Sequence, residues 1–85
     1  MIEDLDRLIA DEERRIRALR RAVDVRLVWI RTGARDRAEA EHLAATAREV
    51  ALRLFPDKAP VFDLVYAPRF RRAISERFDP PAAVP

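Results

Sequence analysis

Residues 2–33, IEDLDRLIADEERRIRALRRAVDVRLVWIRTG, carry the most regular pattern in the chain and decide its fold. Apolar side chains recur here at alternating steps of three and four residues, which is the heptad repeat of a helix that packs along one face. Gly33, the only glycine of the sequence, follows at the point where a helix commonly ends. The pattern predicts one long helix over residues 2–31. We call its repeat positions the seam, which comprises Ile2, Leu5, Ile9, Glu12, Ile16, Leu19, Val23, Arg26 and Ile30.

One segment of this helix, VDVRLVWI at residues 23–30, leaves an alternative open. Its β-branched residues alternate with charged ones, as they would in a half-buried strand. The rest of the sequence offers no second strand with which it could pair, so the helix is favoured. On a helix this segment is apolar on several sides, and we therefore expect it to be the most buried part.

A second helix is predicted over residues 36–54, beginning at Asp36. The link from Thr32 to Arg35 is short, so the two helices should form an antiparallel hairpin. Because the second helix is clearly shorter than the first, the hairpin should leave the first third of the long helix uncovered. Alanine dominates the apolar stripe of the second helix, which permits close approach to a neighbour. The stripe consists of Ala40, Leu43, Ala44, Ala47, Val50, Ala51 and Leu54.

A third helix is predicted over residues 60–78, starting at Pro60 and kinked or broken near residues 66–68. Its apolar side chains recur every four residues and continue through Pro68, which lies on the opposite face. The prediction is therefore an all-α, three-helix fold in one domain, residues 1–78, with a disordered or extended Pro-rich tail at 79–85. The four-residue ladder consists of Phe62, Tyr66, Phe70, Ile74 and Phe78.

The composition suits a small helical protein that is completed by self-association. A chain of 85 residues buries only about 60–65% of its unfolded surface, and this one has no cysteine for disulfides. Small chains without such cross-links often oligomerise. No stretch resembles a signal peptide, and no apolar run approaches the roughly 18 residues of a membrane span. We expect a soluble, cytoplasmic protein.

The seam is the predicted interface of an antiparallel homodimer or a higher oligomer. Six acidic residues and one arginine give residues 1–13 a net charge of −5, whereas nine arginines and two aspartates give residues 14–37 a net charge of +7. Antiparallel helices bring these opposite charges together. An axis near Leu19 would place Glu12 beside Arg26 of the second chain. The predicted interface comprises Ile2, Leu5, Ile9, Glu12, Ile16, Leu19, Val23 and Arg26.

The third helix is apolar on a second face, which makes it a candidate surface for another protein. Val61, Leu64 and Val65 lie off the aromatic ladder, and arginine, which is enriched at interface hot spots, flanks them. The predicted partner surface comprises Val61, Leu64, Arg69 and Arg72. We therefore predict a non-enzymatic protein–protein interaction or regulatory module.

An alternative function is nucleic-acid binding through arginines of the long helix. Arg7, Arg14, Arg17 and Arg21 share the face opposite the seam and would form a basic ridge. Acidic residues four positions before Arg7, Arg15 and Arg17 are placed to neutralise about half of this ridge. No recognised DNA- or RNA-binding motif accompanies it, so a solvated face with local ion pairs is favoured.

A second alternative is an enzyme that acts through arginines alone. One histidine, one serine, no cysteine and no Gly-rich phosphate loop leave no nucleophilic triad, and no cofactor is predicted. The long, medium, medium helix layout resembles that of the helical chorismate mutases, and this resemblance implies mutase chemistry by arginine electrostatics. The sequence departs from that family at the positions of its catalytic side chains, which here hold Asp6 or Arg7, Val23 or Asp24, Arg69 and Ala73.

Glu39 and His42 have the Glu-x-x-His spacing of carboxylate-bridged metal sites in helix bundles. Such a site needs further carboxylates from a facing helix, and residues 24–28, which should lie opposite, supply only Asp24. Glu39 and His42 also lie off the alanine stripe. We therefore expect His42 to face solvent and predict no metal.

Overall fold

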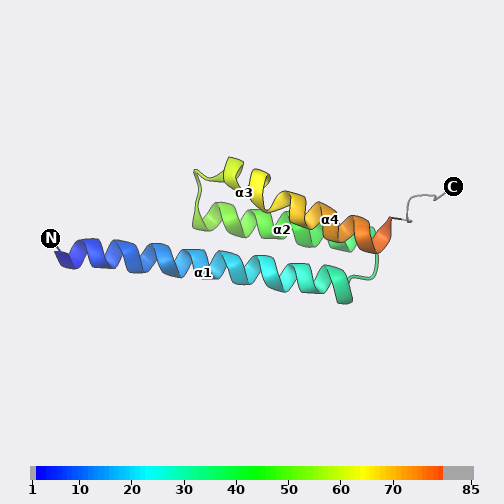
Figure 1. Cartoon of the computed structure of the whole chain (residues 1–85), viewed down its shortest axis with the longest axis horizontal. Coiled ribbons are helices and arrows are strands. Elements are labelled where there is room, and N and C mark those ends of the chain that lie inside the picture. The colour runs from blue at the N-terminus through cyan, green and yellow to red at the C-terminus, as the bar shows by residue number, and fades with distance from the viewer. Residues whose placement is uncertain (1, 80–85) are drawn as a thin grey trace.

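The computed structural model describes residues 2–79 and confirms an all-helical fold (Figure 1). Its helices are α1 (Ile2–Thr32), α2 (Arg37–Leu54), α3 (Ala59–Val65) and α4 (Ala67–Phe78). α1 and α2 pack side by side as the predicted hairpin. α3 and α4 together form one bent helix that packs along α2, while α4 also packs on α1. Of the tail expected at residues 79–85, only Asp79 lies within the described part of the chain.

The segment at residues 23–30 is helical, so the strand alternative is wrong. It is the most buried part of α1, because Val23, Leu27 and Ile30 are enclosed by the other helices. Its opposite face is not covered, although that face is apolar too. The residues there that stay about half exposed are Val25, Val28 and Trp29.

α1 ends at a glycine that is needed for close packing and not for an unusual backbone angle. The Gly33 and Ala34 amides donate to the Trp29 carbonyl oxygen over 2.7 and 2.8 Å, and neither residue has a positive φ. A Cβ at position 33 would lie 3.1 Å from Trp29 Cδ1, so glycine leaves room for the indole ring. Arg77 of α4 donates from Nη1 to the Ile30 carbonyl oxygen over 2.6 Å, which satisfies one of the free carbonyls at this helix end.

α2 is held at both ends by side chains. At its start the Asp36 carboxylate accepts a hydrogen bond from the Glu39 amide over 2.8 Å, which is the predicted N-cap. At its end Arg15 of α1 donates to the Leu54 carbonyl oxygen over 3.5 Å, and its guanidinium lies 5.3 Å from the centre of the Phe55 ring. The buried residues of α2 are mostly alanine, as predicted: Ala40, Leu43, Ala47 and Ala51.

The predicted kink is a break between α3 and α4 at Tyr66. Tyr66 keeps near-helical angles (φ −97°, ψ −38°), so the chain bends without forming a loop. Pro68 falls in the first turn of α4, where an amide hydrogen would have no carbonyl partner within that helix, so the break removes most of the cost of this proline. The aromatic ladder continues across the break, with ring centres 5.6 Å apart for Phe62 and Tyr66 and 6.3 Å apart for Phe62 and Phe70.

The core lies where the second half of α1 meets the alanine stripe of α2 and the ladder of α3 and α4. Phe70 is 1% exposed and is the largest side chain that is fully enclosed. Within the described residues, the first position of α1 to pack against this core is Leu19. The core therefore uses only the second half of α1. None of the described helices is long and apolar enough to cross a membrane.

Replacing Phe70 with alanine should lower the free energy of unfolding by about 3–5 kcal/mol, because it leaves a cavity in the core. Leu64 of α3 is 78% exposed, so the control Leu64→Ala should change this free energy by no more than about 0.5 kcal/mol. Urea unfolding, followed by circular dichroism at one protein concentration, measures both. Equal effects of the two substitutions would contradict this placement of the core.

Candidate functional site

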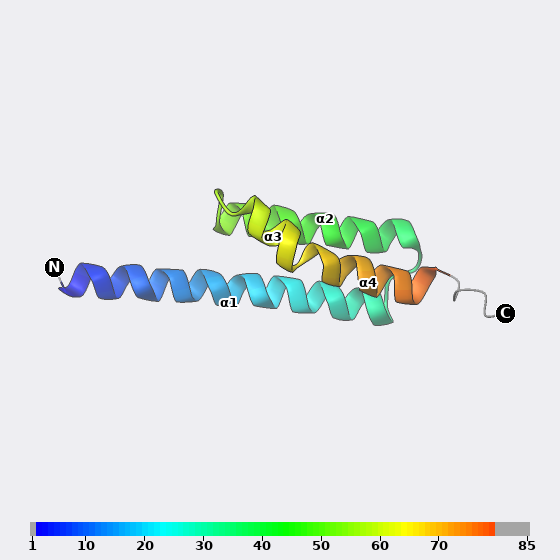
Figure 2. The ribbon, with the colours of Figure 1, turned by 45° about the horizontal axis from the view of Figure 1, so that its top comes forward.

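The first half of α1 extends beyond the other described helices (Figure 1, Figure 2). At about 1.5 Å per residue, the 31 residues of α1 span roughly 46 Å and the 18 residues of α2 roughly 27 Å. The contact of Arg15 with the Leu54 carbonyl marks the point along α1 where α2 ends. We call residues 3–14, which precede this point, the arm. The prediction that the hairpin leaves the first third of α1 uncovered is confirmed.

The arm carries apolar side chains that no other described helix covers. Leu5 is 57% exposed, Leu8 64% and Ile9 47%. Leu5 and Ile9 belong to the same seam as Val23, which lies in the core, so the stripe that builds the core continues into solvent. Exposed apolar side chains that gather on one face make the arm a candidate interaction site.

The seam runs from the arm into a groove between α1, the end of α2 and α3, which we call the α1–α3 groove. Its volume is about 270 Å³. Most of its lining is apolar, and Glu12 and Lys58 add one charge of each sign. Because Glu12 follows Ile9 by three residues on the same face of α1, the arm and the groove adjoin. The lining residues are Glu12, Leu19, Ala51, Phe55, Lys58, Val61, Phe62 and Tyr66.

The second half of the seam is used inside the chain. Val23 is fully buried, and Arg26 donates from Nε to Thr46 Oγ1 of α2 over 3.0 Å. Neither side chain is free to meet a second chain. The predicted dimer axis near Leu19, with Glu12 beside Arg26 of the second chain, would require Arg26 to leave this contact with α2. The seam residues that remain accessible within the described side chains are Leu5, Ile9, Glu12, Ile16 and Leu19.

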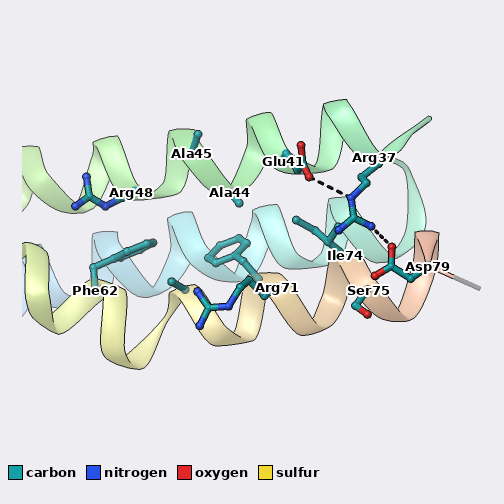
Figure 3. A pocket seen from close by; sticks show the side chains of 12 residues that line it. Arg37, Glu41, Ala44, Ala45, Arg48, Phe62, Arg71, Ile74, Ser75 and Asp79 are labelled. Carbon is teal, nitrogen blue, oxygen red and sulfur yellow. Dashed lines mark hydrogen bonds and ion pairs between the residues drawn. The ribbon is translucent and has the colours of Figure 1, made fainter. Parts of the chain in front are cut away.

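A second and larger groove, of about 570 Å³, lies between α2 and the α3–α4 helix (Figure 3). We call it the α2–α4 groove. Its floor is the outer edge of the aromatic ladder. Figure 3 shows Arg37 of α2 held between Glu41 on its own helix and Asp79 at the end of α4. Farther along α2, Arg48 binds both carboxylate oxygens of Asp63 over 2.9 and 3.1 Å. Arg37 and Arg48 are therefore both paired within the chain, and Arg71 is a further arginine of the lining.

The Arg48–Asp63 pair fixes the charge state near the α3 end of the α2–α4 groove. Hydrogen bonds from Arg48 hold the pKa of the Asp63 carboxyl below its usual value, and the charges of Arg48 and Arg71 act in the same direction. The same pairing raises the pKa of the Arg48 guanidinium. Asp63 therefore stays ionised at more acidic pH than a free aspartate does.

No protein-family model, curated protein or solved structure matches this chain. The candidate sites therefore have to be judged by their own geometry and chemistry.

The positions that correspond to the catalytic side chains of helical chorismate mutases do not form a polar site. Val23 and Ala73 are fully buried in the apolar core. Two positions that would hold polar catalytic side chains in that family are therefore apolar here. The other corresponding positions are exposed: Asp6, Arg7, Asp24 and Arg69.

The arginine ridge of α1 is exposed but interrupted. All four of its members, Arg7, Arg14, Arg17 and Arg21, face solvent. Arg14 forms an ion pair with Asp11. Asp11 was expected to pair with Arg15, but Arg15 instead binds the Leu54 carbonyl oxygen at the end of α2. The ridge therefore loses part of its charge near its centre.

The predicted partner surface of the third helix divides between two sides. Leu64 and Val65 are exposed on the outer face of α3, and Arg69 and Arg72 are exposed on α4. Val61 is also half exposed, but it lines the α1–α3 groove. Val61 and Leu64 therefore belong to different surfaces.

The Glu39 and His42 side chains do not come together with other metal-ligating groups. His42 is exposed, as expected. The Glu39 carboxylate accepts a hydrogen bond from Arg35 Nε over 2.9 Å, and this bond lowers the pKa of Glu39. Across residues 2–79, no three histidine, cysteine, aspartate or glutamate side chains gather as ligands of one metal would.

Sequence reasoning missed the arginines that join distant helix ends. Arg15 and Arg77 bind carbonyl oxygens that lie 39 and 47 residues away along the chain. Arg48 pairs with Asp63 across two helices. No local spacing identifies such partners, because packing of the helices brings them together.

The Arg48–Asp63 pair should make stability depend on pH in one direction. Because pairing lowers the pKa of folded Asp63, its contribution is complete above the free-aspartate pKa of about 3.9 and is lost as pH falls through the folded value. The difference in urea midpoint between the unaltered protein and Asp63→Asn should be constant from about pH 6 to 8 and should shrink below about pH 3. A difference that stays constant across the whole range would contradict an ionised pair.

Proposed function

We propose that this protein is a non-enzymatic helical interaction module that works as a homodimer joined through the arm of α1. The observation that carries the proposal is the arm, whose apolar side chains Leu5, Leu8 and Ile9 are about half exposed. Helices in proteins draw most of their stability from packing of an apolar face, and the other described helices leave the apolar face of the arm about half exposed. A second surface that covers the arm would supply this packing.

A second copy of the chain has a surface of the required chemistry. The arm is acidic, and the part of α1 that follows it is basic. An antiparallel pair of α1 helices places each acidic arm beside the basic part of the other chain, and such complementarity favours this partner and this orientation. A two-fold contact also uses the same patch on both chains, so every favourable contact occurs twice.

The apolar surface of the arm supports a modest affinity. Since its three large apolar side chains are already about half covered, completing their burial contributes on the order of 1 kcal/mol each, and both copies contribute. This gain is opposed by an association cost of roughly 4 kcal/mol or more. Burial of these side chains alone therefore leaves at most about 2 kcal/mol, whereas a dimer at micromolar concentration needs about 8 kcal/mol, so the dimer also depends on the groove lining and on the complementary charges.

The α2–α4 groove supports a non-enzymatic role, although it is the larger of the two grooves. Two of its three bordering arginines, Arg37 and Arg48, are each paired with a carboxylate of the same chain, and the third is Arg71. An arginine-based enzyme needs such groups free to bind an anionic substrate. Both arginines instead hold α2 against the α3–α4 helix.

The proposal leaves the outer face of α3 and α4 for a different protein. Leu64 and Val65 are exposed there, with Arg69 and Arg72 beside them on α4. We include a cytoplasmic location in the proposal, because a chain without cysteine needs no oxidising compartment for its fold.

The oligomeric state tests this proposal. Light scattering at tens of micromolar protein should give about twice the 9.8 kDa of one chain. The double variant Leu5→Glu/Ile9→Glu should give the mass of one chain and keep the unfolding transition of the core, because both side chains lie outside the core. The control Leu64→Glu places a charge on an exposed leucine of α3 and should leave the dimer intact. A single-chain mass for the unaltered protein would contradict the proposal.

A further inference from the structure

We propose that the α1–α3 groove is the docking site for the arm of a second copy of the chain. The two copies exchange arms about a two-fold axis. This axis crosses the pair of α1 helices midway between Ile9 and Glu12 of each chain. This inference rests on the proposed function, because it names the surface that the second copy uses. It also assigns a role to Val61, which the folded single chain leaves half exposed in the groove.

The groove begins where the arm ends, on the same face of α1. Ile9, Glu12 and Ile16 follow one another at steps of three and four residues, so their side chains share one side of the helix. Glu12 and Leu19 line the groove, and Val61 of α3 forms part of its opposite wall. A helix that lies along the accessible seam would therefore contact α1 and α3 together.

One antiparallel register satisfies both copies with the same contacts. When Ile9 lies opposite Glu12 of the second copy, Leu5 lies opposite Ile16 of the second copy. Residues 3–9 of each arm then lie opposite residues 12–18 of the other chain, which is the stretch of α1 that borders the α1–α3 groove. The half-exposed apolar side chains of the arm thereby reach the apolar lining of the groove.

The charges favour this direction. In the antiparallel register, Asp4 and Asp6 of the arm run beside residues 15–20 of the second copy, which include three arginines. Lys58 adds a further positive charge in the groove. A parallel pair would instead place the acidic arms together, and like charges in contact oppose association.

The α2–α4 groove is a less suitable site for the arm, although it is larger. Its arginines Arg37 and Arg48 are already paired with Asp79 and Asp63. The accessible part of the seam leads into the α1–α3 groove, and no α1 residue lines the α2–α4 groove.

Disulfide cross-linking tests the register, because the sequence has no cysteine of its own. Leu5→Cys and Ile16→Cys are prepared separately, mixed until subunits have exchanged, and oxidised. In the proposed register these two positions face each other. Identical positions lie roughly 16 Å apart along the helices, and a disulfide needs Cα atoms within about 7 Å. We expect a disulfide-linked dimer in the mixture and none in either variant alone.

Any other cross-linking result contradicts the proposed antiparallel register. A cross-link in Leu5→Cys alone, or in the control Leu19→Cys alone, would show either a parallel pair or an antiparallel pair with its axis at that residue. If no sample cross-links but light scattering still gives the mass of two chains, this register is refuted, and the mass of the Leu5→Glu/Ile9→Glu variant then shows whether the arm still joins the two chains. A mass of one chain would refute the proposed function as well.

A pair of variants on α3 tests the groove without cysteine. Val61→Arg places a bulky charge on the groove wall, whereas the matched control Leu64→Arg places the same side chain on the outer face of the same helix. Both residues are exposed in the single chain, so both variants should keep its unfolding transition. Val61→Arg should give a single-chain mass at a concentration where Leu64→Arg remains dimeric. Equal masses for the two variants would overturn the assignment of the groove.

Discussion

The enclosure of Phe70 between α1 and α2 is the contact on which the rest of the structure depends. It places the aromatic ladder against Val23, Leu27 and Ile30 of α1 and against the alanine stripe of α2. Because α2 is much shorter than α1, this meeting point lies at the second half of α1. Arg77, which binds the end of α1, helps to hold the helices in that register. The core is therefore complete without the first half of α1.

The free arm follows from this difference in length. A small chain without disulfides or a bound metal has few means of stabilising surplus apolar surface, and association is the common one. The arm and the α1–α3 groove are adjacent parts of one apolar strip. This strip lies on the first part of α1, where an antiparallel second copy would bring the acidic arm of one chain beside the basic part of α1 in the other. In the arrangement we propose, the single chain is half of a larger core.

Local patterns were sufficient to predict the helices, the hairpin, the Asp36 cap and the bend, because periodicity, short links and proline act over a few residues. They could not show which half of the seam is covered. Ile9 and Val23 occupy equivalent positions in the repeat, and only the length of α2 and the path of α4 separate their surroundings. The roles of Arg15 and Arg26 were also missed, because their partners on α2 lie 39 and 20 residues away along the chain.

Hydrogen exchange of the arm amides at several protein concentrations tests the central claim most directly. If a second copy covers the arm, protection of amides in residues 6–14 should rise with concentration as the dimer forms. Amides near Leu27 should be protected even when the chain is dilute, since the core of the single chain encloses that turn. Arm amides that exchange at the same fast rate at every concentration would contradict a dimer joined through the arm.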